Sequence, residues 1–494
     1  MTNNIEGKEK LKKLLYFHNP WWIDHRVPDS LKLTFQRPVL KKLLEYFKLD
    51  RVILIKGPRR TGKTTLLYQI IDELITKRKV PAQNIIYLSC DDPELRVLTN
   101  PSSDLQMNLS DILDVYEQLR EKTVIELKPN EKIYLFLDEV HFWKGWQFEI
   151  KKYFDKKYPL KFILSGSSAS LIKRGSESLM GRTIEELILP FSFYEFLSCQ
   201  LKDKKLDKII LNLQKNFTLS NNLPKEVKGL FSDNTYSPLP IDQLIPYQDK
   251  IKILFAEYLN RGGFPHLLEV ENPILWQRLL REDVIEKVIY RDLVDLYEIK
   301  KPQVLEKFFL YLSGHSSDIM NITNIANSLC LSREYTLKYL NYLIESFLVF
   351  GIKKYSPSVE KQVRSNQKVH LIDSGLITVF GGGNNENRVD GQKVESLIGR
   401  CFLKDKVFYW REKEEVDFVL DLDTGTGGSK SLLPIEVKYR NTILPRDLKG
   451  IIKFMTKYGA REGVVVSKDL LEKMEQNDKI LWLIPAWLLL LIIN

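Results

Sequence analysis

The first 189 residues alternate short apolar runs with segments of helical periodicity. Four of these runs are VILIK at 52–56, NIIYLS at 84–89, KIYLFLD at 132–138 and KFILSGS at 161–167. Runs that are apolar at every position indicate strands covered on both faces. Their alternation with helices predicts a parallel α/β sheet that ends near Leu189. An amphipathic helix, PVLKKLLEYFK at 38–48, is expected before the first strand.

Beyond Leu189 the pattern changes three times. Residues 190–300 are mostly helical around a polar stretch at 217–240, which we interpret as an insertion. Residues 301–380 predict three helices and then short strands, and residues 381–494 predict a helix, three strands, a helix and a strand. The terminal run ILWLIPAWLLLLII is shorter than a bilayer span and contains Pro485, which favours a buried strand and helix over a tail anchor.

Composition narrows the class of protein. With 494 residues, 44% of them hydrophobic, the chain is globular and long enough for about three domains. Lys and Arg number 74 against 64 Asp and Glu, a net charge of +10 that favours nucleic acid over a membrane surface as partner. The four cysteines are scattered and lack zinc-ligand spacing, so we expect a reducing, cytoplasmic location and no membrane partner.

A phosphate-binding motif follows the first strand. The pattern G-x-x-x-x-G-K-[ST] stands between a predicted strand and a predicted helix, which is the context that the motif requires. Its backbone amides would surround the phosphates of ATP, Lys63 would reach the β- and γ-phosphates, and Thr64 would bind Mg²⁺. The nucleotide-binding residues predicted here are Gly57, Pro58, Arg59, Arg60, Thr61, Gly62, Lys63, Thr64 and Thr65.

Two acids end a later strand. Asp138 is expected to complete the Mg²⁺ shell, and Glu139 is the candidate base for the attacking water. Ser165 and Ser167 end the next strand, where a hydroxyl could sense the γ-phosphate or simply cap a helix. These positions predict hydrolysis as well as binding.

The chain also resembles a known family. The stretches NPWW, GPRRTGKTTLL, LDEVH, ILSGSSAS, SLMGRTIEELILPFSFYEFL and YLNRGGFPHLL look like the AAA+-like ATPases of archaea and bacteria that carry a C-terminal domain of unknown function. The resemblance implies an ATPase core at 1–189 and a helical lid at 190–300. It also implies Arg182 as arginine finger or nucleotide-sensing residue, with Arg60 and Arg174 as alternatives. If Arg182 acts on a neighbouring subunit, a homo-oligomer such as a ring is expected.

Residues 301–380 are typical of a winged helix-turn-helix. Helices are expected at 303–313, 321–329 and 332–346, followed by strands in FLVFGIKKYS and QKVHLID. Leu337, Leu340 and Ile344 would face the core. Groove contacts are expected from Arg333, Thr336, Lys338 and Asn341, and phosphate contacts from Lys353, Lys354, Lys361, Arg364 and Lys368. The segment could equally bind a protein.

Residues 381–494 carry a set of carboxylates in a suggestive order. Glu395 lies in a predicted helix, Asp417 in a strand, and Glu436 and Lys438 two apart on the next strand, so that they share a face. The three carboxylates could bind Mg²⁺ or Mn²⁺, and Lys438 could act on water or phosphate. The set resembles a PD-(D/E)XK nuclease, a restriction-endonuclease-like α/β fold, although a non-catalytic docking domain stays open.

Together these features predict an Mg²⁺-dependent ATPase that acts on DNA, in the strong form a motor or remodeller of duplex or branched DNA with a metal-dependent nuclease site. The alternative is an ATP/ADP-controlled switch that regulates a protein partner and has a non-catalytic nuclease-like domain. A nuclease with a vestigial ATPase is disfavoured because Lys63, Thr64, Asp138 and Glu139 are all present.

Overall fold

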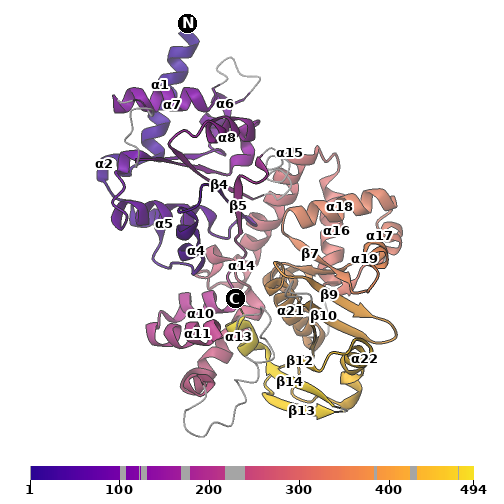
Figure 1. Ribbon diagram of the computed structural model, residues 1–494. Coiled ribbons are helices and arrows are strands. Elements are labelled where there is room, and N and C mark those ends of the chain that lie inside the picture. Colours follow the sequence, from indigo (N-terminus) through magenta and orange to yellow (C-terminus); the bar gives the residue numbers. More distant parts are fainter. Residues whose placement is uncertain are drawn as a thin grey trace. The chain divides into compact units, whose positions relative to one another are not determined.

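The computed structural model forms two compact units, residues 1–189 and residues 190–494 (Figure 1). The described residues are 2–100, 107–121, 123, 131–167, 179–216, 240–382, 386–422, 431–476 and 478–493. Nearly all of the polar stretch predicted as an insertion therefore lies outside the described residues. The first unit ends where the predicted ATPase core ends, and the three other predicted segments share the second unit.

The first unit contains one fully parallel sheet. Its strands are β1 (Val52–Lys56), β2 (Ile85–Ser89), β3 (Ile133–Asp138), β4 (Leu160–Gly166) and β5 (Thr183–Leu187), in the order β2-β3-β4-β1-β5. This confirms the predicted parallel sheet. Because all five strands run the same way, the segments that follow β1, β3 and β4 meet at one edge of the sheet.

Helices cover both faces of this sheet. They are α1 (Thr2–His18), α2 (Trp21–Asp24), α3 (Asp29–Lys32), α4 (Val39–Tyr46), α5 (Lys63–Thr76), α6 (Pro93–Leu98), α7 (Leu109–Arg120) and α8 (Trp146–Asp155). Val52 and Leu54 belong to a core built with α1, α6, α7 and α8, whereas Ile53 and Ile55 belong to a second core built with α2, α4 and α5. Figure 1 shows the two groups of helices on opposite faces. Burial on both faces explains why the strands are apolar throughout.

Strand β5 did not emerge from the sequence pattern. It pairs with β1 at the edge of the sheet, with Ile53 opposite Ile184. Its sequence, TIEEL, contains two glutamates, and only one of its five residues is fully buried. An edge strand that buries so little apolar surface gives a weak hydrophobic signal.

The second unit begins with helices, as predicted for residues 190–300. They are α10 (Phe193–Leu201), α11 (Lys204–Asn216), α13 (Gln248–Arg261), α14 (Pro273–Leu280) and α15 (Leu293–Tyr297), with a π-helical segment at Arg281–Asp292. The three helices predicted for residues 301–346 follow as α16 (Pro302–Gly314), α17 (Ile322–Ser328) and α18 (Arg333–Glu345). Their bounds agree with the sequence analysis to within one residue at each end.

A nine-stranded sheet joins the last two predicted segments. Its order is β13-β14-β12-β11-β10-β9-β7-β8-β6. The strands are β6 (Asp318–Ile319), β7 (Val349–Lys354), β8 (Lys368–Leu371), β9 (Val407–Arg411), β10 (Glu415–Asp421), β11 (Leu432–Val437), β12 (Glu462–Ser467), β13 (Glu472–Gln476) and β14 (Lys479–Pro485). Strands β7 and β8 are those expected as the wing, and β7 also pairs with β9, where Lys353 lies opposite Phe408. The expected wing is thus continuous with the C-terminal sheet.

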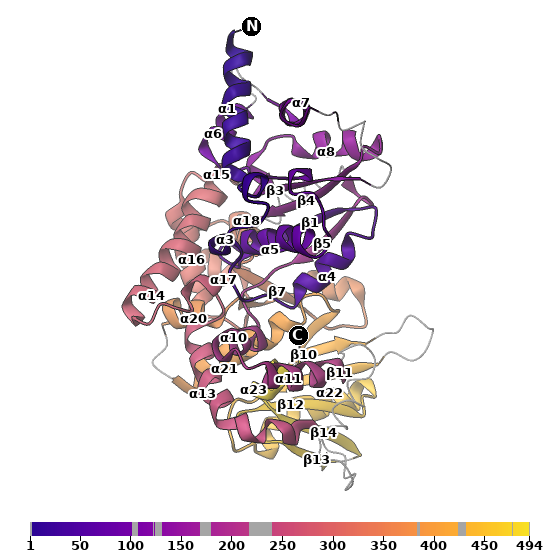
Figure 2. The same cartoon turned by 90° about the vertical axis from the view of Figure 1, so that its left-hand side faces the viewer.

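Helices pack against this sheet in turn. They are α19 (Val359–Arg364), α20 (Ser374–Phe380), α21 (Glu386–Cys401), α22 (Lys449–Tyr458) and α23 (Ala486–Ile492). Ile451 and Phe454 of α22 share a core with Trp410 of β9 and Val465 of β12. In Figure 2 the C-terminal strands β12, β13 and β14 lie beside one another in yellow.

The apolar C-terminal run folds as the sequence analysis predicts. It forms β14 and α23, with Pro485 at the junction, and its residues from Leu481 to Ile493 are buried. Across the described residues, no helix combines the length and the apolar character needed to cross a membrane.

Candidate nucleotide site and carboxylate cluster

The phosphate loop connects β1 to α5 and is folded tightly. Gly57 leaves no room for a side chain, because a Cβ there would lie 1.9 Å from the carbonyl oxygen of Ile188. Gly62 precedes α5 with φ +85°, a conformation that favours glycine. Arg37 donates to the carbonyl of Thr61 at 3.0 Å and so supports the loop from outside. The loop therefore presents backbone amides at the N-terminus of a 14-residue helix.

Lys63 lies inside this loop. Its side chain is 4% exposed, and Nζ donates to the carbonyls of Gly57 at 3.0 Å and Pro58 at 2.8 Å. The carboxylate of Glu139 is 3.7 Å from the same Nζ. The ammonium is thus held at the place where phosphate oxygens would enter the loop.

Thr64 and Asp138 meet across the edge of the sheet. The hydroxyl of Thr64 donates to Asp138 Oδ2 at 2.6 Å, and the hydroxyl of Tyr87 donates to the same oxygen at 2.9 Å. Ser165 donates to Oδ1 of Asp138. Burial raises the pKa of Asp138, the charge of Glu139 raises it further, and the three hydroxyl donors oppose this rise.

Glu139 follows β3 in a left-handed conformation, with φ +49°. This conformation is uncommon for a residue with a side chain and carries backbone strain, which proteins retain most often at functional sites. The carboxylate accepts from the backbone amide of Ser167 at 3.0 Å and lies 3.3 Å from Nδ1 of His141. Its own amide donates to Ser165 Oγ at 3.1 Å. Glu139 is therefore oriented toward Lys63 by contacts from β4.

Arg182 lies at the amino ends of β1 and β5, whereas the phosphate loop follows the carboxyl end of β1. Its carbonyl accepts from the amide of Val52, the first residue of β1, and its guanidinium binds Asp155 at 2.6 and 3.2 Å. The phosphate loop follows the last residue of β1, and a strand of this length spans about 16 Å. Within one chain Arg182 is thus not brought to the phosphate site. Arg59 is half-buried and Arg60 is exposed in the loop itself, and Arg174 lies outside the described residues.

The carboxylates predicted for the C-terminal segment do come together. Asp417 on β10 lies beside Glu436 on β11, because the register pairs Phe418 with Ile435, and Asp417 Oδ2 accepts from the amide of Val437 at 2.8 Å. Lys438 binds Glu436 through Nζ and Oε1. The two-residue spacing of Glu436 and Lys438 therefore places both side chains on one face, as predicted.

A lysine that was predicted for another role occupies this cluster. Lys368 of β8 was expected to neutralise DNA phosphates, but it is 1% exposed, and that expectation is wrong. Its Nζ lies 2.6 Å from Glu395 Oε1 and 2.8 Å from Asp417 Oδ1. A fourth acid, Glu415, lies 2.7 Å from the same nitrogen. We call these residues, with Glu436 and Lys438, the carboxylate cluster.

Charge and burial set the protonation of this cluster. Burial, reinforced by the charge of Asp417, raises the pKa of Glu395 and of Glu436 to about 8. Burial opposes the charge of Asp417, but Lys368 and Lys438 hold its pKa below the ordinary value. Burial likewise opposes the charge of Lys368, but the surrounding carboxylates raise its pKa well above the ordinary value. The Lys368 ammonium is therefore charged.

Helix α18, the expected recognition helix, exposes a mixed face. Ser332 caps it by accepting from the amide of Tyr335 at 3.2 Å. Arg333, Lys338 and Asn341 are exposed, as predicted. Two assignments were wrong: Thr336 is fully buried, whereas Leu337 is 43% exposed. One turn of helix separates Thr336 from Leu340, so the buried stripe runs through Thr336 rather than Leu337.

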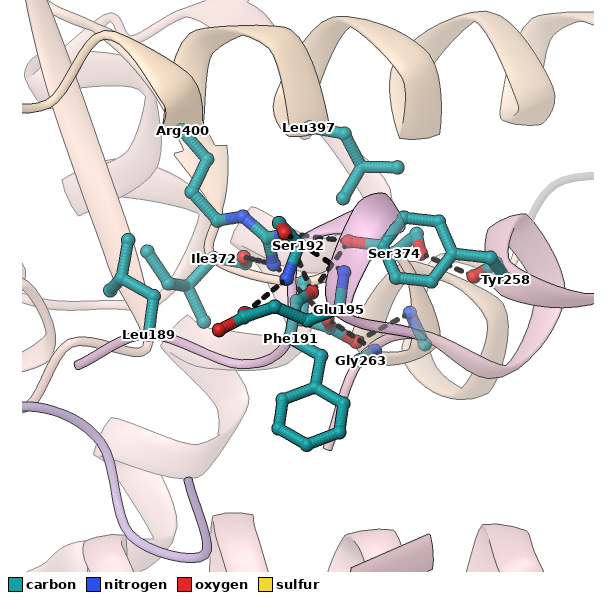
Figure 3. A network of polar contacts seen from close by, with 12 residues as sticks. Leu189, Phe191, Ser192, Glu195, Tyr258, Gly263, Ile372, Ser374, Leu397 and Arg400 are labelled. Atoms are coloured by element: carbon teal, nitrogen blue, oxygen red, sulfur yellow. Dashed lines mark hydrogen bonds and ion pairs between the residues drawn. The ribbon is translucent and has the colours of Figure 1, made fainter. Parts of the chain in front are cut away.

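The stretch Gly262-Gly263-Phe264-Pro265 contacts a buried polar network through Gly263 (Figure 3). Arg400 donates to the carbonyls of Ile372 and Phe191 at 3.1 Å, to the Tyr258 hydroxyl at 2.5 Å, and lies 3.3 Å from Asp373 Oδ2. Asp373 also accepts from the amide of Gly263 at 2.9 Å.

Gly262 and Gly263 are required by this network. A Cβ on Gly262 would lie 1.8 Å from Asp373 Oδ1, and a Cβ on Gly263 would lie 2.3 Å from the Phe191 carbonyl. Within the second unit the double glycine is thus a close-packed structural turn.

One known family matches the residues that form the nucleotide site. Residues 49–197 match the family described as AAA domain. This match supports a P-loop ATPase with ATP as its nucleotide. Residues 252–386 and 394–489 match two families described as Domain of unknown function, DUF8612 and DUF4143.

Relatives of similar length occur in bacteria and archaea. An uncharacterized protein of Haemophilus influenzae is 24% identical over 427 residues, covering 82% of this chain and 91% of the relative. Two uncharacterized proteins of Methanocaldococcus jannaschii are 24% and 26% identical, covering 93% and 90% of this chain and 92% and 87% of the relatives.

Two solved structures show weaker similarity. Caenorhabditis elegans PCH-2 is 15% identical, with 50% of this chain and 66% of that chain covered and a TM-score of 0.29. AMPPCP-bound DnaA from Aquifex aeolicus is 16% identical, with 67% and 93% covered and a TM-score of 0.24. Scores this low do not establish a common overall arrangement.

Three contacts at these sites were not anticipated from the sequence. Tyr87 donates to Asp138 from the middle of β2, an edge strand of the sheet, and its position within the run NIIYLS predicts only a core residue. Glu415 and Lys368 join the carboxylate cluster from β10 and β8. A lysine within the short strand KVHL, which is otherwise buried, is the one sequence signal that could have indicated the role of Lys368.

Proposed function

We propose that this protein is an Mg²⁺-dependent ATPase that acts on DNA, with Glu139 as the base that accepts a proton from the attacking water. The observation that carries the ATPase part is the convergence of Thr64, Asp138, Glu139 and Lys63 at the mouth of the phosphate loop. Few arrangements other than nucleotide hydrolysis require a lysine, a hydroxyl and two acids at a helix N-terminus.

The residues at this site fit an Mg²⁺ ion. The Thr64 hydroxyl and the Asp138 carboxylate are hard oxygen ligands 2.6 Å apart, and Mg²⁺ binds through one or two such groups together with phosphate oxygens. When bound, Mg²⁺ would neutralise charge on the β- and γ-phosphates. Lys63 would exchange its two carbonyl partners for phosphate oxygens.

Glu139 can hold a water molecule for attack. Its carboxylate is fixed by the Ser167 amide and stands 3.7 Å from Lys63, which would contact the γ-phosphate. A general base must lie within hydrogen-bonding reach of the proton that it accepts, and the short distance between Glu139 and Lys63 supports this role for a water beside the phosphate.

Replacement of Glu139 by glutamine tests this assignment. The amide keeps the shape but cannot accept a proton, so we expect ATP hydrolysis to fall by about 10²–10⁴-fold while ATP affinity is retained. Steady-state phosphate release and equilibrium binding of a fluorescent ATP analogue measure the two quantities. Unchanged hydrolysis would refute Glu139 as the base, and lost binding would show a structural role instead.

The DNA part of the proposal rests on α18 and the strands that follow it. Arg333 and Lys338 are exposed on α18, and Lys353, Lys361 and Arg364 are exposed on β7 and α19. Basic side chains on a helix and on an adjacent ribbon can neutralise successive phosphates of a duplex.

Reversal of charge on α18 tests the DNA contact. The double variant Arg333→Glu, Lys338→Glu should bind duplex DNA more weakly and should show a shallower dependence of affinity on salt concentration, because two phosphate contacts are removed. Exposed Lys473 lies on β13, at the far end of the sheet order from the wing strands, and Lys473→Glu is the matched control. Equal salt dependence in all three proteins would contradict the assignment of this face.

An oligomer follows if Arg182 is the arginine finger. Because Arg182 lies at the amino ends of β1 and β5 and the phosphate loop follows the carboxyl end of β1, Arg182 could serve only the nucleotide of a neighbouring subunit. We propose this arrangement and test it by mixing Arg182→Ala with Lys63→Ala protein. Recovery of hydrolysis in the mixture would support action between subunits, and additive inactivity would contradict it.

The alternative function is an ATP-controlled switch for a protein partner. One observation favours it: helices α18 and α19, which carry basic residues, also expose Tyr335 (55%), Leu337 (43%), Val359 (72%) and Val363 (70%). Exposed apolar side chains grouped on neighbouring elements are typical of protein-binding surfaces. Hydrolysis that does not respond to any DNA would favour this reading.

A further inference from the structure

The carboxylate cluster has a cation in its centre, and that cation is a side chain. Lys368 Nζ lies 2.6, 2.7 and 2.8 Å from oxygens of Glu395, Glu415 and Asp417. An ammonium has three N–H donors, and its charge-assisted hydrogen bonds to carboxylates have lengths of about 2.7–2.9 Å. The ammonium donates hydrogen bonds to Glu415 Oε1 and Asp417 Oδ1 and forms a close ion pair with Glu395 Oε1. Three different acids therefore surround its charge.

The predicted metal site does not fit this arrangement. Mg²⁺ would need oxygen ligands at about 2.1 Å in a near-octahedral shell. Within the described ranges, no group of three or more acidic, histidine or cysteine side chains is placed to hold a metal ion. An ion between Glu395 and Asp417 would have to stand where Nζ stands.

We propose that Lys368 replaces the divalent cation of the carboxylate cluster, so that the native protein binds no Mg²⁺ or Mn²⁺ there and cuts no nucleic acid at this site. The cluster is then a latent metal site. Removal of the lysine frees the space between Glu395 and Asp417, and Mn²⁺ should bind there once the side chains of Glu395, Asp417 and Glu436 have moved inward to become its ligands. This inference concerns only the second unit and does not depend on the ATPase assignment.

The surroundings show that Lys368 is placed there by the fold. Its strand is paired on both sides, with Ile352 of β7 and Ile319 of β6 opposite Lys368 itself. Lys368 is 1% exposed. Burial of an unpaired ammonium costs on the order of several kcal/mol of folding free energy, so a lysine this buried needs carboxylates beside it. Three acids supply that match, so Lys368 has no competing position in solvent.

One carboxylate oxygen of the cluster is buried without a hydrogen-bond partner and could serve as a metal ligand. Glu436 Oε2 is buried and, among the described residues, has no hydrogen-bond partner, while its other oxygen binds Lys438. Glu436 is 5% exposed and lies beside Asp417 in the sheet. An unpartnered buried carboxylate oxygen next to the ammonium marks where a metal ligand would stand once Lys368 is removed.

Lys368 also links two segments of the second unit. It belongs to β8, one of the two strands expected as the wing, whereas its partners belong to α21 and β10 of the predicted nuclease-like segment. The ion cluster therefore fixes the wing strands to the C-terminal strands. In this account the cluster holds segments together, and it does not perform hydrolysis.

The test measures Mn²⁺ binding by electron paramagnetic resonance on the full chain without nucleotide. The proteins are wild type, Lys368→Met, Lys368→Met combined with Glu436→Gln, and Lys449→Met as a control at an exposed lysine. We expect one additional Mn²⁺ site in Lys368→Met that wild type lacks, and we expect the double variant to lose that site. Wild type and Lys449→Met should bind equally. A folded Lys368→Met protein without an additional site would overturn the proposal.

A second comparison needs no change at Lys368. Glu436→Gln leaves all three partners of Lys368 in place, so it should fold whether or not Lys368→Met does. The proposal requires that wild type and Glu436→Gln bind Mn²⁺ equally and that neither cleaves single-stranded, duplex or junction DNA with Mn²⁺. Mn²⁺ binding or cleavage by wild type that Glu436→Gln removes would overturn it.

Discussion

Arg400→Met is expected to destabilise the second unit strongly. Arg400 is 6% exposed and makes four polar contacts, with the carbonyls of Phe191 and Ile372, the hydroxyl of Tyr258 and the carboxylate of Asp373. Asp373 is 0% exposed, so removal of Arg400 leaves a buried carboxylate without its countercharge. Breaking a buried ion pair in this way costs about 3–5 kcal/mol.

Other contacts of Asp373 reduce the cost of losing Arg400, and this cost depends on pH. Asp373 keeps two backbone donors, the amides of Gly263 and Gly375, each at 2.9 Å. Burial already raises the pKa of Asp373 while Arg400 lowers it, so the variant should have a still higher pKa in the folded state. A carboxyl whose folded pKa exceeds its unfolded pKa loses stability as pH rises between the two values. The destabilisation should therefore be smallest near pH 4 and largest near neutral pH.

Hydrogen exchange followed by mass spectrometry measures the effect in the full chain. For buried amides of β11 and β12 that exchange through global opening, 3–5 kcal/mol corresponds to exchange about 140–3,700-fold faster. Arg278→Met is the control, because Arg278 is 65% exposed and its ion pair with Glu282 lies at the surface. Exchange of β11 and β12 that is as slow in Arg400→Met as in the control, at neutral pH, would refute the reasoning.

Three further predictions concern the phosphate loop, the candidate Mg²⁺ site and a buried histidine. Gly57→Ala should destabilise the first unit and abolish ATP binding, because its Cβ would lie 1.9 Å from the Ile188 carbonyl; thermal unfolding and nucleotide binding would show it. Thr64→Ala should keep nucleotide affinity without Mg²⁺ but lose the gain that Mg²⁺ provides, since the partner of Asp138 is removed; calorimetry with and without the ion measures this. Burial holds the pKa of His370 well below its ordinary value, so its contribution to stability should be present above about pH 6.5 and be lost as pH falls below it. His370→Phe should reduce this acid-dependent loss in urea unfolding, and an unchanged pH profile would contradict the assignment.

The first unit was largely predictable because its signals are local and consistent. Residues Val52 to Ile55 of β1 are apolar at every position, and both faces of this stretch are buried as that pattern predicts. The phosphate-loop motif fixes a turn, a lysine and a hydroxyl within eight residues, so Lys63 and Thr64 appear where the motif places them. Strand β5 was missed because it pairs at an edge and buries little apolar surface.

The sequence predicts the individual helices and strands of the second unit, but it does not predict that Lys368 joins the carboxylate cluster. Helical periodicity predicted the bounds of α16 and α18 closely, and the strand pattern placed Asp417 and Glu436 on successive strands, because each signal depends on residues near in sequence. The role of Lys368 depends on the pairing of β7 with β9, which brings β8 near β10 across 49 residues of sequence. No local pattern encodes that contact, and a lysine between strands is read as solvated unless its partners are known.

The exposure of α18 shows a smaller error of the same kind. The sequence pattern predicts that Leu337 faces the core, but the helix is rotated so that Thr336 is buried instead. The Thr336 hydroxyl donates to the Ser332 carbonyl at 3.0 Å. Threonine can satisfy its hydroxyl within its own helix, which lowers the cost of burying it. The rotation leaves Arg333 and Lys338 exposed, so the proposed basic face is retained.

The measurement that tests the central claim most directly is Mg²⁺-dependent ATP hydrolysis by the full chain, alone and with single-stranded, duplex or four-way-junction DNA. The account predicts hydrolysis that requires Mg²⁺ and Glu139 and that at least one of these DNA structures stimulates strongly. Stimulation should weaken in the Arg333→Glu, Lys338→Glu variant. Hydrolysis at the same rate with every DNA would contradict a DNA-acting ATPase, and the absence of hydrolysis under all conditions would contradict the nucleotide site itself.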